Sequence, residues 1–436
     1  MGPATVVRRQ RADRSKHRSM VDQEGAVSNV ATALPTPQSL RPLVLPDAQA
    51  PEDDIPLVRP VVPNPAAVAD DVERILASGI LTNGPFVREL EGRAAEYLGV
   101  RHCVAVSSCT SGLMLVLRAA ELSGDVVVPS FTFAATAHAV SWNGLRPAFA
   151  DIDPGTLTLS PAAVRRAVGV RTSAILATHT FGTPCDIEGL ADVADRNGIR
   201  LFFDAAHAFG SLHDGVPIGG FGDAEVFSLS PTKVLVAAEG GIVATNDDVL
   251  AEQCRIGRDY GNPGDYDCVF VGLNARMSEV HAAIALASLD GLDERIEHRN
   301  QLVTRYREGL GALPGIGFPE VMPQDRSTYK DFTILVGAEQ FGLRADELGE
   351  ALSAVGIDTR RYYAPPVDAM KAYRSLVSGN DGLPVTEAAA ARVLTLPLWS
   401  DMEPSLVNRV VDAVTRIRRF VVQDGVGVAG GRDSAG

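Results

Sequence analysis

The sequence has few cysteines, and none of them stands at a metal-binding spacing. The five are Cys103, Cys109, Cys185, Cys254 and Cys268. Their number is odd and there is no Cys-x-x-Cys arrangement, so neither a disulfide framework nor a zinc knuckle is expected. We therefore predict a reduced, cytoplasmic environment and no metal site.

Positive charge is also in deficit, since 40 lysines and arginines face 54 aspartates and glutamates. The formal net charge of −14 argues against a surface for nucleic acid or for an anionic membrane. No apolar run approaches the ~20 residues that a membrane-spanning helix needs. We predict neither a nucleic-acid nor a membrane partner, and any phosphate on a ligand must be bound by local groups.

The length of the chain, 436 residues, suits two domains. Residues 1–54 have a basic start without the apolar stretch of a secretory signal, followed by Pro, Ser, Ala and Gln without a period. This composition predicts a disordered N-terminal extension. We place a large domain at 55–312, a smaller C-terminal α/β domain at 313–422 and a flexible tail at 423–436.

Short apolar strands alternate with helical patterns from residue 104 to residue 245. The alternation predicts a parallel or mixed sheet covered by helices on both faces. The sequence has no internal repeat and no Gly-x-Gly-x-x-Gly. Residues 277–307 predict one long helix, and residues 359–363 predict a strand of the smaller domain.

One lysine stands out because its neighbours are apolar or small. Lys233 follows Phe-Ser-Leu-Ser-Pro-Thr and precedes Val-Leu-Val, with no acidic residue within five positions on either side. Such surroundings desolvate an ammonium, lower its pKa and favour the free amine that can form a Schiff base. The alternative is an ordinary surface lysine in a loop.

An aspartate upstream favours the chemical interpretation of this lysine. Asp204 ends the apolar stretch Leu-Phe-Phe, as a carboxylate at the end of a buried strand would. A lysine for an aldehyde and an aspartate for a pyridinium nitrogen are the pair that pyridoxal 5'-phosphate requires. The sequence therefore predicts this cofactor, with Lys233 and Asp204 as catalytic residues.

Two strand-to-helix junctions offer further contacts to such a cofactor. Residues 107–112 carry small hydroxyl side chains that can bind a phosphate at a helix N-terminus or simply cap the helix. Residues 131–136 carry a phenylalanine whose ring can lie on a pyridine ring or belong to the core. His207 is either a ligand of a cofactor hydroxyl or a structural histidine. Cys109 has no base beside it in the sequence, and we interpret it as a small residue of the phosphate loop.

Seven stretches, in this order, resemble the DegT/DnrJ/StrS family of sugar aminotransferases over roughly residues 56–420. The chain looks most similar to the 4-aminotransferases of TDP-4-keto-6-deoxyhexoses in antibiotic sugar pathways. The resemblance implies the α/β fold type I of pyridoxal phosphate-dependent transferases (aspartate-aminotransferase-like), with a large mixed seven-stranded sheet domain and a smaller C-terminal α/β domain. It also implies a homodimer with shared active sites. The stretches are 108–111, 129–136, 149–153, 204–207, 227–233, 239–241 and 272–277.

The resemblance implies a role for each matched residue. Lys233 would hold the cofactor covalently and move the proton, and Asp204 would pair with the pyridine nitrogen. Phe133 would stack on the ring, and His207 would lie near its 3-hydroxyl. The phosphate would be bound by Thr110, the Cys109 amide, Ser228 and Asn274 of the partner subunit.

These residues predict an aminotransferase that moves an amino group from L-glutamate to a TDP-linked 4-keto-6-deoxy sugar. The product would be a 4-amino-4,6-dideoxy sugar for secondary-metabolite glycosylation. Family members with histidine in place of Lys233 dehydrate sugars, so the lysine favours amino transfer. The alternatives are a 3-aminotransferase for a 3-keto sugar and a non-catalytic regulator with the same fold. The sequence departs from the family at Cys109, where glycine is common, and in residues 362–368, which lack a usual histidine.

Overall fold

The computed structural model describes residues 54–61, 64–375 and 382–424, which fall within one compact unit. The predicted N-terminal extension and tail therefore lie almost entirely outside the described residues. The predicted domain boundary between residues 312 and 313 stays a prediction. No helix within the described ranges is long and apolar enough to cross a membrane.

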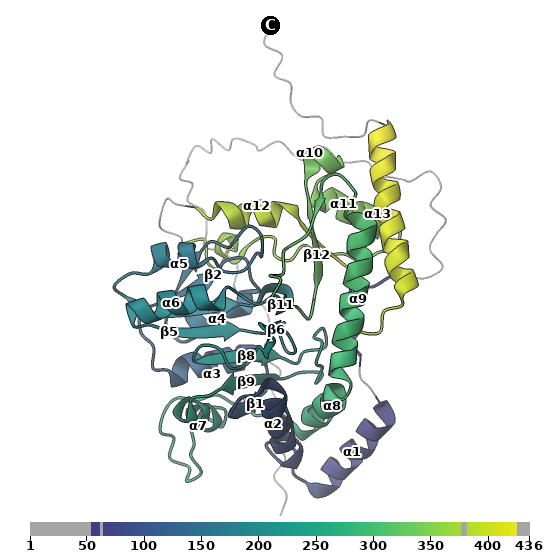
Figure 1. The fold of residues 1–436 in the computed structure, drawn as a ribbon. Helices are drawn as coiled ribbons and strands as arrows, with labels where there is room; N and C mark the ends of the chain where they lie inside the picture. Colours follow the sequence, from purple (N-terminus) through teal and green to yellow (C-terminus); the bar gives the residue numbers. More distant parts are fainter. Residues whose placement is uncertain (1–53, 62–63, 376–381, 425–436) are drawn as a thin grey trace, which may run out of the picture. The chain divides into compact units, whose positions relative to one another are not determined.

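A seven-stranded sheet lies at the centre of the N-terminal part of the described chain (Figure 1). Its strand order is β1-β9-β8-β5-β4-β2-β3. Neighbouring strands are parallel except in the pairs β1–β9 and β8–β9, so β9 alone runs against the others. The prediction of a mixed sheet is confirmed. The strands are β1 His102–Val106, β2 Asp125–Pro129, β3 Arg146–Ala150, β4 Thr172–Thr178, β5 Arg200–Asp204, β8 Ala224–Ser228 and β9 Gly241–Thr245.

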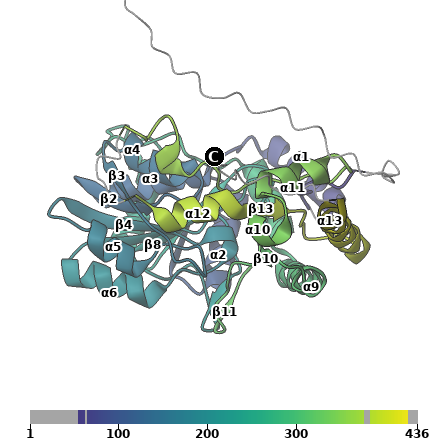
Figure 2. The same cartoon turned by 90° about the horizontal axis from the view of Figure 1, so that it is seen from above.

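Helices cover both faces of this sheet, as Figure 2 shows for α3 and α4 on one side and α5 and α6 on the other. Successive side chains of a strand point to opposite faces, so Val127 packs into one hydrophobic cluster and Val126 and Val128 into the other. This alternation explains why nearly every strand residue is apolar. The covering helices are α2 Pro85–Leu98, α5 Pro161–Ala167, α6 Ile187–Asn197 and α8 Glu279–Leu289 on the first face, and α3 Cys109–Ala119, α4 Ala134–Trp142 and α7 Asp248–Gly257 on the second.

The C-terminal part of the described chain packs a separate hydrophobic cluster around an antiparallel sheet of three strands. Helices α9 and α13 lie side by side against this sheet (Figure 1). The fully buried ring of Tyr306 in α9 stacks on Phe332 in β12, with 4.7 Å between their centres. The elements are β10 Ile316–Gly317, β12 Phe332–Val336, β13 Val393–Leu396, α9 Leu292–Leu310, α10 Ala338–Phe341, α11 Ala345–Ser353, α12 Pro384–Arg392 and α13 Pro404–Asp424. The remaining elements are α1 Pro65–Ser78, the small sheet of β6 Leu212–His213, β7 Val216–Pro217 and β11 Asp325–Arg326, and two 3-10 turns at Thr180–Gly182 and Val367–Ala369.

Two predictions of secondary structure are wrong. The long helix expected over 277–307 is divided into α8 and α9, because Gly291 takes a left-handed conformation with φ of 65°. The strand expected at 359–363 does not form. Arg360 makes only an isolated bridge to Thr395, and the chain then turns toward two prolines that have no N–H to donate to a ladder.

Buried carboxylates fix two helix N-termini against the sheet core. Glu279 is fully buried and accepts hydrogen bonds from the amides of Gly84, Phe86 and Val87 at 2.8–3.0 Å, which caps α2. Asp151, just after β3, accepts from the amides of residues 385 and 386 at 3.0 and 2.8 Å, which caps α12. Such caps satisfy amides that a helix leaves unpaired and favour a negative charge there. The second cap ties the C-terminal part of the chain to the large sheet.

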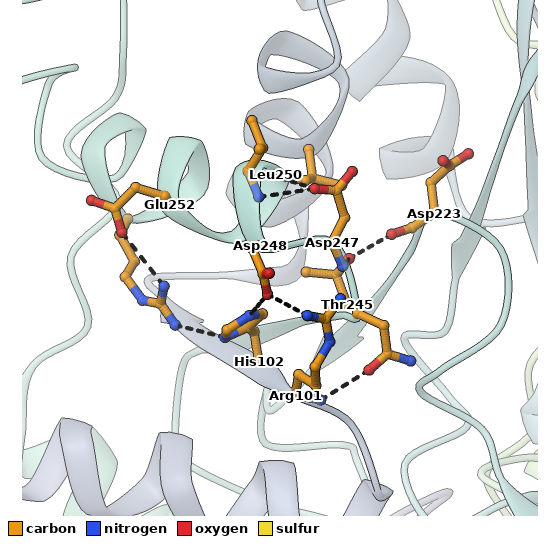
Figure 3. Close-up of polar contacts among 11 residues, drawn as sticks. Arg101, His102, Asp223, Thr245, Asp247, Asp248, Leu250 and Glu252 are labelled. Carbon is orange, nitrogen blue, oxygen red and sulfur yellow. Dashed lines mark hydrogen bonds and ion pairs between the residues drawn. The ribbon is translucent and has the colours of Figure 1, made fainter.

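A cluster of polar residues holds α7 near the start of β1 (Figure 3). Asp248 accepts from Arg101 at 2.7 Å and contacts the His102 ring at 2.6 Å. The Thr245 hydroxyl donates to the carbonyl of Asp223 at 2.6 Å. Arg101 and His102 lie at the start of β1, Asp223 lies just before β8, and Thr245 ends the reversed strand β9. The cluster is therefore at the edge of the sheet opposite to the one where β5 and β8 end.

Candidate active site

A cavity of about 260 Å³ opens where β5 and β8 end and where α3 and α4 begin. The carboxyl ends of parallel strands meet at one edge of a sheet, and ligands of such sheets bind there. The cavity is lined by seven of the eight residues predicted as catalytic or cofactor-binding, and Asn274 is absent from its lining. The seven are Cys109, Thr110, Phe133, Asp204, His207, Ser228 and Lys233.

Asp204 brings a buried carboxylate to the floor of the cavity. It is the last residue of β5 and is only 4% exposed. Its Oδ2 accepts a hydrogen bond from the Thr136 hydroxyl at 2.7 Å, and its Oδ1 accepts from the Ala206 amide at 3.1 Å. Burial raises the pKa of Asp204, and the hydrogen bonds from Thr136 and Ala206 oppose that rise. The carboxylate is therefore oriented from both sides and shielded from water.

Cys109 lies in the first turn of α3, with its side chain close to Asp204. Its Sγ lies 3.9 Å from Asp204 Oδ1 and donates to the carbonyl of Val226 at 3.5 Å. Burial raises the pKa of this thiol well above its usual range, with a further rise from the charge of Asp204. The thiol is therefore a poor nucleophile. The sequence placed Cys109 in the phosphate loop, and the structure adds this contact to the carboxylate.

A glycine allows the first turn of α3 to approach the reversed strand. A Cβ on Gly241, the first residue of β9, would lie 2.7 Å from the Cys109 amide nitrogen and 2.9 Å from the Phe227 carbonyl oxygen. Any larger residue would push β9 away from the cavity. The N-cap of α3 is Ser108, whose hydroxyl accepts from the Ser111 amide at 3.1 Å. The predicted strand-to-helix junction is thus present beside the cavity, with the cap that the sequence left as an alternative.

Lys233 lies in the loop that joins β8 to β9. The loop is held at both ends, since Leu229 donates its amide to Gly240 at 2.9 Å and accepts from the Ala237 amide at 2.8 Å. The side chain of Lys233 is partly buried and lines the cavity together with Asp204. Burial, followed by the positive charge of Lys330, lowers the pKa of Lys233 to about 8. A larger fraction of this amine is therefore unprotonated near neutral pH than in an ordinary lysine.

The other predicted cofactor contacts occupy different parts of the cavity. Burial lowers the pKa of His207 well below its usual range, so its ring is neutral, and its buried Nδ1 has no hydrogen-bond partner among the described residues. Ser228 ends β8 and is 8% exposed. Phe133 precedes α4 and is 63% exposed, so it lines the cavity at its solvent-exposed rim.

The cavity also contains four residues that the sequence analysis did not select: Lys330, Asp331, Tyr362 and Tyr363. Lys330 Nζ lies 2.7 Å from Asp331 Oδ1, and both side chains are less than a tenth exposed. One signal in the sequence, the scarcity of lysine, could have drawn attention to Lys330. The chain has four lysines, at positions 16, 233, 330 and 371, and two of them line this one cavity.

Asn274 lies apart from the cavity in the single chain. It is exposed and forms an isolated bridge with Asp259. Its predicted contact with the phosphate of a partner subunit stays a prediction.

Comparison with known proteins identifies the family. Residues 65–415 match the model of the DegT/DnrJ/EryC1/StrS aminotransferase family. The chain belongs to this family. It is a pyridoxal phosphate-dependent aminotransferase, and the family and fold predicted from the sequence are confirmed.

The match to individual relatives extends over nearly the whole length of each relative. The aminotransferase is 33% identical over 361 residues to the dTDP-4-amino-4,6-dideoxy-D-glucose transaminase of Escherichia coli, across 82% of this chain and 96% of the relative. It is 36% identical over 346 residues to the dTDP-3-amino-3,4,6-trideoxy-alpha-D-glucose transaminase of Streptomyces venezuelae, across 79% and 90%. The crystal structure of DesI in the presence of its TDP-sugar product superposes with a TM-score of 0.81 at 40% identity, across 86% of this chain and 95% of DesI.

The cavity of the aminotransferase fits pyridoxal phosphate. An amine of lowered pKa and a buried carboxylate line the same space, as the aldehyde and the ring nitrogen of the cofactor require. The buried Nδ1 of His207, without a partner among the described residues, provides a further polar atom for the cofactor. The first turn of α3 lines the same space, and helix N-termini favour phosphate.

The charge of Lys330 predicts a measurable effect on Lys233. Replacing Lys330 with Met removes the cation that lowers the pKa of Lys233 and leaves the charge of Asp331, which raises it. We therefore expect the acetylation midpoint of Lys233 in cofactor-free protein to move from about 8 toward the ordinary lysine value. Competitive acetylation across pH, read by mass spectrometry against a small amine standard, measures this midpoint.

The matched control is Lys371→Met, which removes an exposed lysine outside the cavity lining. It should leave the midpoint of Lys233 unchanged. An unchanged or lower midpoint in folded Lys330→Met protein would contradict the electrostatic coupling between the two lysines.

Proposed function

We propose that this aminotransferase transfers an amino group from L-glutamate to a TDP-linked 4-keto-6-deoxy sugar, giving a 4-amino-4,6-dideoxy sugar. The observation that carries amino transfer is the amine of Lys233 in one cavity with the buried carboxylate of Asp204. The nucleotide sugar is supported by the name of the Escherichia coli relative and by the TDP-sugar product of DesI. A 3-aminotransferase is the second candidate, supported by the Streptomyces venezuelae relative.

A purely regulatory role is the third candidate. One relative, 36% identical over 341 residues, is named the erythromycin biosynthesis sensory transduction protein EryC1 of Saccharopolyspora erythraea. A regulator has no need of a lysine of lowered pKa in one cavity with an oriented, buried carboxylate, and this aminotransferase retains both. The site therefore favours catalysis.

Each of the seven predicted residues in the cavity has a defined task in this proposal. Lys233 holds the cofactor and, with a pKa of about 8, takes up and returns a proton at Nζ near neutral pH. Asp204 keeps the pyridine nitrogen protonated, and Phe133 lies on the ring. His207 meets the 3-hydroxyl. The phosphate is bound by Thr110, the Cys109 amide and Ser228. Bound pyridoxal phosphate supplies an electron sink for the substrate carbon.

The role of Asp204 is tested by Asp204→Asn. The amide still accepts a hydrogen bond but cannot stabilise a positive ring nitrogen, so the cofactor loses much of its capacity to withdraw electrons. We expect cofactor content to be retained and the glutamate half-reaction to slow by about 100-fold or more, roughly 3 kcal/mol of barrier. Stopped-flow absorbance of the bound cofactor measures it. A near-normal rate at full cofactor content would show that Asp204 does not pair with the ring nitrogen.

The proposed assembly is a homodimer in which Asn274 of the partner subunit completes the phosphate site. The exposure of Asn274 and of the nearby apolar residues Val269 and Val271 supports an interface there. Lys233→Ala and Asn274→Ala should each be inactive alone, and mixed dimers should regain activity, because one of their two sites carries neither change. Subunit exchange is verified by native mass spectrometry of tagged chains. Absence of recovery after exchange would refute the shared site.

The position of amination is tested with a panel of nucleotide sugars. The aminotransferase is incubated with L-glutamate and either 3-keto or 4-keto sugars, and NMR locates the new amine. We expect amination at carbon 4 of the 6-deoxy sugar, and Lys233→Ala protein serves as the blank. Amination at carbon 3 alone would favour the second candidate, and no amination of any sugar would favour the regulator.

A further inference from the structure

Two adjacent residues before β12 form a salt bridge in the wall of the cavity. Lys330 and Asp331 are joined at 2.7 Å, and their side chains are 6% and 7% exposed. The Lys330 ammonium also lies 5.7 Å from the centre of the Tyr362 ring. Burying an ion pair carries a desolvation penalty that well-packed apolar residues would avoid. The location of this pair in a ligand cavity therefore indicates a use beyond stability.

The salt bridge leaves one carboxylate oxygen unsatisfied. Asp331 Oδ2 is buried and has no hydrogen-bond partner among the described residues. The nearby guanidinium of Arg299 is already engaged, because it donates to the carbonyls of Thr328, Tyr329 and Lys330 at 2.5–3.1 Å. An unpaired buried carboxylate oxygen is costly, and a hydrogen-bond donor on a ligand would remove that cost.

We propose that Asp331 determines sugar specificity by accepting a hydrogen bond from the nucleotide sugar, with Lys330 balancing its charge. The donor is the hydroxyl on the ring carbon next to the one that gains the amino group. This position follows because Asp331 and Lys233 line the same small cavity, and Lys233 acts at the reacting carbon. The proposal rests on the proposed function, since it requires a sugar substrate.

The two substrates differ in how they meet this pair. Both substrates use the same cavity in turn. The carboxylates of an amino acid have no hydrogen to donate to Asp331, whereas a sugar brings hydroxyl donors. Lys330 offsets the negative charge, so the amino acid is not excluded. Asp331 therefore makes a direct hydrogen bond to the substrate only in the sugar half-reaction.

The test is Asp331→Asn in the pyridoxal phosphate-loaded dimer or monomer as purified. The amide oxygen will face Lys330, so an NH₂ group replaces the free oxygen and cannot accept from the hydroxyl. The same absorbance change reports amino transfer to the cofactor from L-glutamate and from a TDP-4-amino-4,6-dideoxy sugar. We expect the second-order rate constant for the aminosugar to fall by about 10- to 100-fold, the effect of losing a hydrogen bond to a charged group. The rate constant for glutamate should stay within about threefold, because the lost charge of Asp331 acts there only through a lower pKa of Lys233 and not through a lost hydrogen bond.

A sugar without the neighbouring hydroxyl separates specific contact from a structural effect. Wild type and Asp331→Asn should react with this deoxy aminosugar at similar rates. Asp346→Asn, at an exposed salt bridge in α11, is the matched control and should behave as wild type with every substrate.

Equal losses with glutamate and aminosugar would overturn the proposal, because Asp331 would then act on the cofactor or on folding. Unchanged rates with both would also overturn it, as would a loss that persists with the deoxy aminosugar. A wild-type protein that reacts with glutamate but with no nucleotide aminosugar would refute the proposed function itself. That result is seen before any variant is compared, so the two failures are distinguishable.

Discussion

A negative charge shielded from water at the end of β5 is the constraint on which the active site depends. A carboxylate so buried would ordinarily become neutral. Hydrogen bonds from the Thr136 hydroxyl and the Ala206 amide stabilise the charged form of Asp204. The cation that we propose to pair with this carboxylate is the ring nitrogen of the cofactor. The surroundings of Asp204 thus follow from the need of a buried charge for polar partners. The thiol of Cys109 and the amine of Lys233 both lie near this carboxylate.

The same physical device recurs away from the chemistry. Glu279 and Asp151 are buried acids whose oxygens accept backbone amides at the starts of α2 and α12. In each case a side chain distant in sequence satisfies amides that the helix leaves open. The two caps position helices that enclose the sheet and attach the C-terminal part of the chain. The segment with Lys330 and Asp331 is held by another long-range contact, from Arg299.

The sequence predicted what depends on local pattern. Asp204 follows an apolar strand and Lys233 lies between two strands, and parallel strands then bring both to one edge of the sheet. The Lys330–Asp331 pair escaped notice because its proximity to Lys233 depends on Arg299 in α9, which holds the carbonyls of the preceding loop. No local period or motif encodes such a contact. The break at Gly291 was missed for a related reason, since the residues on both sides of it favour helix.

The reversal of β9 has a consequence for how the enzyme can diversify. Because β8 and β9 are antiparallel neighbours, the loop that carries the lysine is closed by the pairing of Ser228 with Gly241, while the aspartate belongs to the strand beside β8. The ends of the lysine loop and the aspartate are therefore held on neighbouring strands of one sheet, which lie about 4.8 Å apart. Asp331, which we propose contacts the sugar, instead lies just before β12, a strand of the smaller sheet. Substitutions before β12 can thus alter substrate range while the reacting groups keep their geometry, so new substrates can evolve without redesign of the catalytic framework.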